Sequence, residues 1–319
     1  MKLSVIVPVY NGQESIGRCL NSIKNQIYND IEIVIVNDGS TDNTADVIKA
    51  FTEEISHIPV TVVNKENQGL PQARKSGVEA AHGEYIGFVD ADDWIEEKFY
   101  DQLMKLAQAS NADIVCSEIT EDRGDGQRIL ANHADRMILS DEEAIKLLHQ
   151  RKAVYQFAWN KIYKKEIFQN VVFPKKNMIG EDYALVVQAI CHSKSIALSK
   201  ACGYHYVILD GSMSHVGYND NFKNGINMYQ VMEKKIRKKY PKCQIYISNF
   251  MIQNYMGAVM AMCQNKKFDY EIITWIKRFI RTHLKEFLKY SPFAIHWKIG
   301  VTLFAINEKI FLTIYSKIH

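Results

Sequence analysis

Residues 83–100, GEYIGFVDADDWIEEKFY, join an apolar run to a tight cluster of acidic side chains. The run YIGFV has the length and composition of a buried strand, and the carboxylates Asp90, Asp92 and Asp93 follow it directly. Carboxylates this close together repel each other and raise one another's pKa unless positive charge lies between them. A bound divalent cation is the usual source of that charge. We therefore expect a strand whose end holds a metal ion.

Four further apolar runs in the first 120 residues have the same character. They are short and rich in Val and Ile: LSVIVPV (3–9), IEIVIVN (31–37), VTVVN (60–64) and DIVCSE (113–118). Segments with apolar residues at three-to-four spacing lie between them and predict helices at 15–26, 44–54, 71–82 and 95–110. Alternating strands and helices imply right-handed crossovers and a mostly parallel sheet covered on both faces. The expected fold class is therefore α/β, with ligands at the carboxyl ends of the strands.

The pattern changes after about residue 121. EDRGDGQR (121–128) predicts an exposed loop or hairpin tip, and Ser140 with Glu143 forms a capping box at the start of a helix. A helix over 181–191 and short strands at 195–199 and 203–208 follow. From about residue 220 the chain is expected to be nearly continuous helix, broken near Pro241, Asn265 and Pro292. We expect a first domain over 1–220, with halves 1–120 and 121–220, and a helical region over 221–319.

Charge is distributed unevenly along the 319 residues, although the net charge is only +3. Residues 1–120 hold 9 Lys and Arg against 19 Asp and Glu, whereas residues 221–319 hold 17 against 5. The two ends are therefore expected to do different jobs. The six cysteines are scattered without a C-x-x-C pair, which argues against a zinc site or a disulfide framework and suits a reducing compartment. No signal peptide or spanning apolar segment is recognised, so we expect a cytoplasmic protein that can contact the inner face of the cell membrane.

The loops that follow the predicted strands are polar and are expected to converge on one edge of the sheet. Asp38, after the second strand, lies where an open sheet presents a carboxylate to a ribose or a base; capping its own turn, DGST, is the alternative. Asp93 is as well suited to be the N-cap of a following helix as to be a ligand, because Glu96 lies three residues later, as in a capping box. The chain has no G-x-G-x-x-G after its first strand and no P-loop, which disfavours nicotinamide enzymes and P-loop NTPases. Asp90 and Asp92 suit Mg²⁺ or Mn²⁺, which bind few protein carboxylates and complete their shell with phosphate and water.

The loops together resemble the nucleotide-sugar-binding half of family 2 glycosyltransferases, the inverting bacterial enzymes of GT-A fold. PVYN (8–11), NDGSTDNT (37–44), NQGLPQARKSG (67–77) and FVDADD (88–93) carry the resemblance, which extends from residue 1 to about 215. It implies a base and ribose site at Pro8, Tyr10, Asn11, Glu14 and Asp38. It implies contacts near the base and diphosphate from Asn67, Gly69 and Arg74. It also implies an Asp-X-Asp motif made of Asp90, Ala91 and Asp92, in which Asp92 is the principal ligand of Mn²⁺ or Mg²⁺.

Transfer of a sugar also requires a base that removes the proton of the acceptor hydroxyl. NMIGEDYALVVQAI (177–190) offers Glu181 and Asp182 at a helix N-terminus, where negative charge is favoured, after Gly180, which permits a tight turn. Capping of that helix is the alternative. The resemblance implies that Asp182 is the base and that Glu181 orients the acceptor or the base. The expected reaction is one in-line displacement that inverts the anomeric configuration.

Two later segments also resemble features of the family. AWNKIYKKEIF (158–168) contains Trp159, which either stacks on an acceptor sugar or is an ordinary buried Trp. In GYHYVILDGSMSH (203–215), the resemblance implies that Ser212 and His215 approach the diphosphate or the metal. Val207 occupies the position at which the family would have Arg, so the sequence departs from the family pattern here.

The basic C-terminal region carries no nucleic-acid-binding element. We expect its Lys and Arg to face anionic lipid while aromatic side chains enter the interface, namely Trp275, Phe279, Trp297, Phe304 and Phe311. A homodimer interface is the alternative. The expected function is transfer of a hexose or N-acetylhexosamine from a UDP-sugar to a lipid-linked saccharide in cell-surface polysaccharide synthesis. A catalytically inactive nucleotide-sugar-binding partner and a nucleotidyltransferase are the competing functions.

Overall fold

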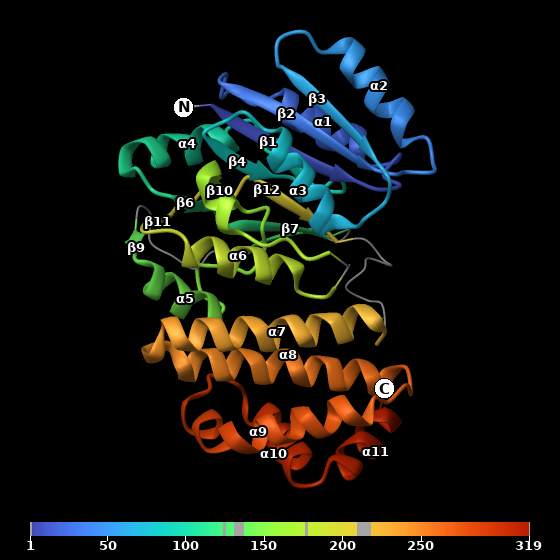
Figure 1. Ribbon diagram of the computed structural model, residues 1–319, viewed down its shortest axis with the longest axis vertical. Helices are drawn as coiled ribbons and strands as arrows, with labels where there is room; N and C mark the ends of the chain where they lie inside the picture. Colours follow the sequence, from blue (N-terminus) through green and yellow to red (C-terminus); the bar gives the residue numbers. More distant parts are fainter. Residues whose placement is uncertain (1, 124–125, 131–136, 176–177, 209–217, 319) are drawn as a thin grey trace. The chain divides into compact units, whose positions relative to one another are not determined.

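The structure is a computed structural model that describes residues 2–123, 126–130, 137–175, 178–208 and 218–318. The chain forms two compact units (Figure 1). The first contains residues 1–177 and 181–210, and the second contains residues 178–180 and 211–319.

The first unit is built on a mixed sheet that has eight strands in the described part of the chain, in the order β3-β2-β1-β4-β10-β6-β11-β9. Its parallel portion consists of β3 (Val60–Lys65), β2 (Ile31–Asp38), β1 (Leu3–Val9) and β4 (Tyr85–Phe88). Every residue of β1 and β2 is buried, as a parallel sheet covered on both faces requires. These strands confirm the predictions made from the apolar runs.

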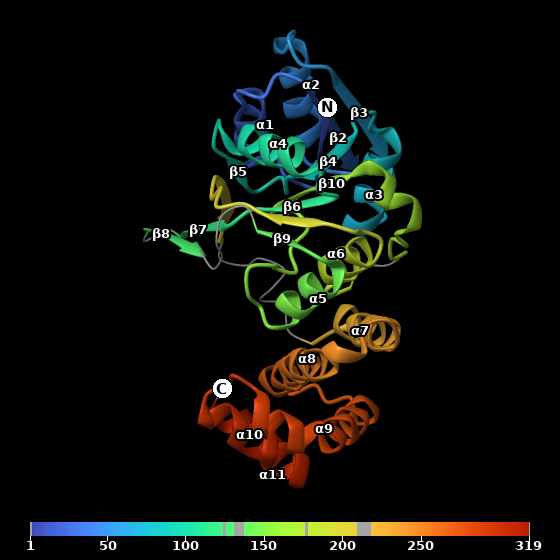
Figure 2. The same cartoon turned by 90° about the vertical axis from the view of Figure 1, so that its left-hand side faces the viewer.

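Helices cover both faces of the parallel portion (Figure 2). Helices α1 (Ile16–Lys24) and α4 (Phe99–Ser110) lie on one face, and α3 (Leu70–Ala80) lies on the other. Helix α2 (Thr44–Glu54) packs against α1. Helix α4 begins at Phe99 rather than near residue 95, because Trp94 and Ile95 form the short strand β5. Asp93 therefore does not cap this helix, and that alternative was wrong.

The rest of the large sheet departs from the parallel pattern. Strand β10 (Lys161–Lys164) runs antiparallel between β4 and β6 (Ile114–Cys116), and β6 pairs in parallel with β11 (Ile196–Leu198). At the edge, β9 (Ile138–Leu139) pairs with β11. Helix α5 (Asp141–His149) begins with the predicted capping box, and the 3-10 helix η1 (Lys165–Asn170) and helix α6 (Glu181–Cys191) follow β10.

A second sheet in the first unit has the order β5-β12-β7-β8. Strands β7 (Ile119–Arg123) and β8 (Gly126–Leu130) form the antiparallel hairpin expected at 121–128. Strand β12 (Tyr204–Val207) lies between β7 and β5. This arrangement places the end of β12 beside the residues that follow β4.

The second unit is helical. It contains α7 (Asp220–Lys239), the 3-10 helix η3 (Pro241–Cys243), α8 (Gln244–Gln264), α9 (Tyr270–Tyr290), α10 (Ile295–Ile306) and α11 (Glu308–Ile318). Helices α7 and α8 run side by side in both views (Figures 1 and 2). The helix breaks fall near Pro241, Asn265 and Pro292 as predicted, and a further break at Asn307 was not predicted.

The aromatic side chains expected to enter a lipid interface are mostly held inside this unit. Phe304 and Phe311 are buried, and their rings meet edge to face at 5.5 Å. Trp275 and Phe279 are half-buried and pack on the ring of Tyr255. The prediction was therefore wrong for Phe304 and Phe311, because they form the core on which α10 and α11 pack.

Candidate active site

The loops after β1 and β2 are joined by hydrogen bonds. The amide of Asn11 donates to the Ser40 hydroxyl at 3.0 Å, and the amide of Thr41 donates to Asn11 Oδ1 at 2.8 Å. The amide of Gly12 donates to the Thr44 hydroxyl at 2.9 Å. Of the residues predicted to surround the base, Pro8 is buried in β1, whereas the side chains of Tyr10, Asn11 and Glu14 are exposed. The exposed side chains remain predicted nucleotide contacts.

Asp38 is buried at the end of β2 and organises the loop after β3. Its carboxylate accepts hydrogen bonds from the amides of Gln68 at 3.1 Å and Gly69 at 2.7 Å, and from Lys65 Nζ at 3.1 Å. Gly69 has φ +87°, a conformation that favours glycine, and Asn67 beside it is exposed. The alternative that Asp38 caps its own turn was wrong, because the Ser40 amide donates to Asn37 Oδ1 instead. Asp38 thus shapes the loop that carries the predicted contacts Asn67 and Gly69.

Arg74 connects the two groups of acidic residues predicted from the sequence. Its side chain, on α3, is only 1% exposed and lies over the ring of Phe88. Nη2 is 3.0 Å from Asp90 Oδ1, and Nη1 forms an ion pair with Asp182 Oδ1. The planar guanidinium therefore holds the end of β4 and the first turn of α6 together, in a geometry that a single ammonium could not provide.

Burial and crowding shift the protonation of these acids. Burial raises the pKa of Asp90 to about 6; Arg74 opposes this effect, and Asp182 and Asp92 add to it. Burial, with Asp182 as the next contribution, raises the pKa of Glu181 to about 7. Burial also raises the pKa of Asp92. Perturbed carboxylates of this kind gather at functional sites.

Asp92 and Asp93 are adjacent but have different environments. Asp93 is fully buried and accepts hydrogen bonds from the Tyr204 hydroxyl at 2.7 Å and the Val207 amide at 2.9 Å. Asp93 therefore anchors β12, and the backbone of Val207, not its side chain, makes this contact. Asp92 is half-buried, as is Ala91, and the Asp92 carbonyl accepts a hydrogen bond from Arg18 Nη2 at 2.5 Å. This leaves Asp90 and Asp92 as the carboxylates suited to bind a ligand.

The donor chemistry of Asp90 and Asp92 fits a hard divalent cation. Both are carboxylates whose negative charge burial makes costly without added positive charge, and neighbouring acids add to this cost at Asp90. Among the described residues, no group of three or more His, Cys, Asp or Glu side chains is arranged to hold a metal ion. Two carboxylates suit a metal that takes its other ligands from phosphate and water. Ser212 and His215, the other predicted contacts, lie outside the described residues.

A column of aromatic rings extends from the acidic cluster. The Tyr204 ring stacks on Trp159 at 4.3 Å, and Trp159 stacks on Phe157 at 4.9 Å and on Tyr206 at 5.4 Å. Trp159 is 2% exposed, so the buried alternative is correct and its faces are occupied by protein rings. Phe157 and Tyr206 are half-buried.

Lys161 is a buried cation whose role the sequence did not suggest. Its Nζ donates to the carbonyls of Tyr155 at 2.8 Å and Phe157 at 2.7 Å, and to Asn160 Oδ1 at 2.6 Å. Burial lowers its pKa to about 8. The sequence offered no clear signal, because the four-residue strand KIYK carries a lysine at each end. Lys161 thereby fixes the loop that carries Phe157.

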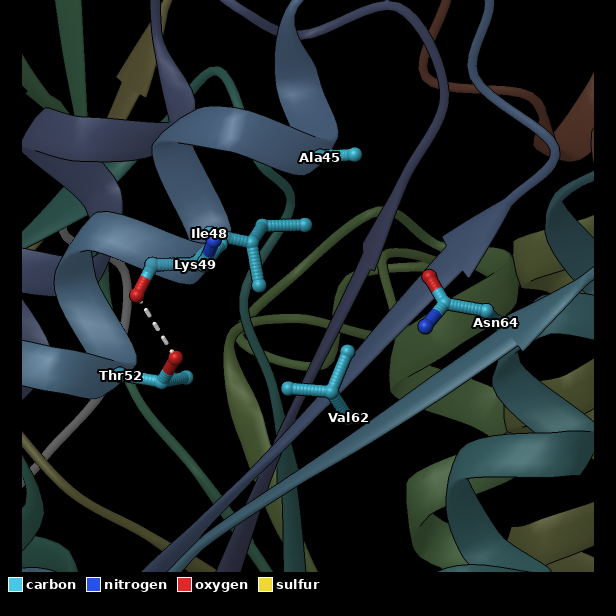
Figure 3. A pocket seen from close by; sticks show the side chains of 6 residues that line it. All are labelled: Ala45, Ile48, Lys49, Thr52, Val62 and Asn64. Atoms are coloured by element: carbon cyan, nitrogen blue, oxygen red, sulfur yellow. Dashed lines mark hydrogen bonds between the residues drawn. The ribbon is translucent and has the colours of Figure 1, made fainter.

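A separate hollow of about 230 Å³ lies between α2 and the edge strand β3 (Figure 3). Its lining residues are Ala45, Ile48, Lys49, Thr52, Val62 and Asn64. None is a carboxylate or a predicted site residue. The acidic cluster is therefore the stronger candidate for the active site.

Comparison with known proteins gives matches in one family. The family model described as Glycosyl transferase family 2 matches residues 4–172. The glycosyltransferase-family protein EpsH of Bacillus subtilis is 32% identical over 72% of this chain and 67% of its own length. The glycosyltransferase GlyA of Streptococcus pneumoniae is 34% identical over 67% of this chain, which spans only 32% of GlyA.

Solved structures share the fold. The structure of S. aureus TarS 1–349 in complex with UDP-GlcNAc matches with a TM-score of 0.70 at 19% identity, covering 90% of this chain and 81% of that one. A mannosyltransferase from Pyrobaculum calidifontis, in complex with GDP-Man and Mn²⁺, matches with a TM-score of 0.54 at 16% identity, covering 99% and 86%. These matches confirm the predicted GT-A architecture with a C-terminal helical region. By the family model and its relatives, the chain belongs to glycosyltransferase family 2.

Proposed function

We propose that this glycosyltransferase moves a sugar from a UDP-sugar to a hydroxyl of a lipid-linked saccharide, with inversion, in the synthesis of a cell-surface polysaccharide. The UDP-GlcNAc complex of TarS supports a UDP-sugar donor. We assign the transferase to residues 1–220, with a donor half at 1–120 and an acceptor half at 121–220. The helices of 221–319 form a separate region.

One observation carries the proposal: Arg74 contacts both Asp90 and Asp182. Asp90 belongs to the Asp-X-Asp pair, and Asp182 is the predicted base. A direct displacement needs the leaving group and the base on opposite sides of the same anomeric carbon, within one site. One buried guanidinium brings the two carboxylates into a single site, which supports this arrangement.

The chain's own residues then have distinct tasks. Asp182 accepts the proton of the acceptor hydroxyl as the hydroxyl oxygen attacks. Asp90 and Asp92 would hold Mn²⁺ or Mg²⁺, which supplies positive charge to the departing diphosphate. Arg74 orients Asp182 and Asp90, and its buried Nε has no hydrogen-bond partner among the described residues. Glu181, beside Asp182 at the start of α6, orients the acceptor or the base.

We propose that the acceptor sugar packs on Phe157 and Tyr206 rather than on Trp159. Tyr204 and Tyr206 are two residues apart on β12, so their side chains share a face of the strand. The Tyr204 hydroxyl contacts Asp93, and Tyr206 lies further along the same aromatic column. Half-buried aromatic faces beside the acidic cluster that follows β4 suit the apolar face of a sugar ring.

The first test is a thermal-shift panel of nucleoside diphosphates and UDP-sugars, with and without Mn²⁺. A ligand that binds only the folded state raises the melting temperature. We expect a Mn²⁺-dependent shift with UDP and one UDP-sugar, followed by Mn²⁺-dependent hydrolysis of that sugar donor. Asp92→Asn should abolish both. Binding without any hydrolysis or transfer would favour the inactive binding partner, and nucleotide transfer to a sugar phosphate would favour a nucleotidyltransferase.

A further inference from the structure

Helices α10 and α11 form a hairpin with a well-packed inner side. Its buried residues are Val301, Phe304, Ala305, Phe311 and Leu312. The turn is fixed by Asn307, whose Oδ1 accepts a hydrogen bond from the Ile310 amide at 3.2 Å. Lys277 of α9 forms an ion pair with Glu308 at the start of α11. The hairpin therefore presents a defined outer side.

That outer side is rich in isoleucine. Five isoleucines are between 46% and 75% exposed: Ile295, Ile299, Ile306, Ile310 and Ile314. Ile295, Ile299 and Ile306 recur at the spacing of one face of α10, and Ile310 and Ile314 recur at the spacing of one face of α11. Exposed apolar side chains that repeat along one face of each of two packed helices indicate an interaction surface rather than ordinary scatter. We call these five residues the isoleucine face.

The charges around the isoleucine face are mostly positive. Residues 295–318 contain Lys298, Lys309 and Lys317 and a single acidic residue, Glu308, which is paired with Lys277. Lys309 and Lys317 are exposed, and helix α9, which packs on α10, exposes four cations (Arg278, Arg281, Lys285 and Lys289) against two acids (Glu271 and Glu286). Apolar side chains beside cations complement a surface that is negatively charged outside and apolar beneath. An anionic lipid bilayer has both properties.

We propose that the α10–α11 hairpin docks on the surface of an anionic membrane through the isoleucine face. Among the described residues, no helix is long and apolar enough to cross a bilayer, so the hairpin would lie in the interfacial layer. The inference rests on the proposed function in one respect: docking on the membrane would bring the enzyme to its lipid-linked acceptor. In this proposal, isoleucines contact the lipid in place of the aromatic side chains that the sequence predicted.

The test uses the full chain and sedimentation with vesicles. We expect most of the protein to sediment with vesicles of phosphatidylglycerol and phosphatidylcholine in 0.15 M NaCl, and little with phosphatidylcholine alone. Raising the salt should weaken binding, because the ionic contribution is screened. The double variant Ile299→Glu/Ile306→Glu should bind at least tenfold more weakly. Val231→Glu makes the same chemical change at an exposed apolar residue of α7 and should bind like the parent chain.

Several results would overturn the inference. One is equal binding by the parent chain and the double variant, and another is no binding to anionic vesicles. A third is a dimer, seen by light scattering, that the double variant converts to a monomer without any vesicle binding by the parent. The melting temperature and the UDP response of each variant are measured in parallel. Loss of vesicle binding with an intact UDP response separates this inference from the proposed function.

Discussion

Arg74 and Asp182 form a partly buried ion pair between α3 and the first turn of α6, although they are 108 residues apart in the sequence. The other arm of the same guanidinium lies 3.0 Å from Asp90. A change at Arg74 should therefore disturb the donor and base sides of the site together. Variants of Arg74 and of Asp182 test this link.

Arg74→Lys should lower kcat by about 100-fold or more, because one ammonium cannot hold two carboxylates in the geometry of a planar guanidinium. Arg74→Leu should also destabilise the fold by about 1–3 kcal/mol, since it leaves two partly buried carboxylates without their partner. Steady-state kinetics and urea unfolding measure the two effects. The matched control is Lys75→Ala, on the exposed side of the same helix, which should change stability by about 0.5 kcal/mol or less. An Arg74→Lys variant with parental kcat would contradict the bridging role.

Asp182→Asn should lower kcat by about 10²–10⁴-fold, because the amide cannot accept the acceptor proton. The UDP affinity should change little, since the proposed donor contacts lie on other residues. Glu181→Gln should lower kcat less, because Glu181 orients the acceptor or the base rather than accepting the proton. Single-turnover transfer and UDP titration separate chemistry from binding. If Glu181→Gln proves the more damaging variant, the two roles are reversed.

The acidic cluster should make metal-free stability depend on pH. The pKa values of Asp90 and Glu181 are raised to about 6 and about 7, whereas the unfolded chain titrates near 4. Between about pH 4 and pH 7 the folded state therefore binds more protons than the unfolded state. The stability that these two groups contribute is fully present below about pH 4 and is lost as the pH rises to about 7. A cation at Asp90 and Asp92 favours the charged forms. We therefore expect Mn²⁺ to raise the melting temperature more at pH 8 than at pH 5.5.

Thermal denaturation at the two pH values, with and without Mn²⁺, tests this expectation. Asp92→Asn is the control, because it removes one predicted ligand and should reduce the Mn²⁺ shift at pH 8. An equal shift at both pH values, or a larger one at pH 5.5, would mean that Mn²⁺ binds elsewhere. The comparison needs no substrate.

The sequence predicted the elements with strong periodicity and missed those that depend on distant partners. Strands β1 to β3 and helix α2 match their predicted bounds closely, because buried parallel strands and amphipathic helices have clear patterns. The four-residue strand β10 has no such pattern, and only the folded chain shows that it runs antiparallel between β4 and β6. The mixed sheet follows from that insertion.

The candidate site shows the same division. The strand-tip acids and the Glu181–Asp182 pair were visible as motifs, but the link through Arg74 joins residues that no local pattern connects. In the C-terminal region, α10 carries apolar residues on all sides, so the sequence alone could not tell which side is buried. The large aromatics Phe304 and Phe311 fill the core, and isoleucines remain outside.

Asp38→Asn distinguishes two roles for the carboxylate at the end of β2. The Asp38 carboxylate accepts hydrogen bonds from the backbone amides of Gln68 and Gly69. The side-chain amide of Asn would turn its NH₂ group toward one of these donors. We expect a loss of about 1–3 kcal/mol in the free energy of unfolding together with weaker UDP binding, because the loop that carries Asn67 loosens. Asn67→Ala, at an exposed position of this loop, should weaken UDP binding with almost no loss of stability. Chemical denaturation and UDP titration of both variants measure these effects. Weakened UDP binding by Asp38→Asn at parental stability would instead identify Asp38 as a direct nucleotide contact.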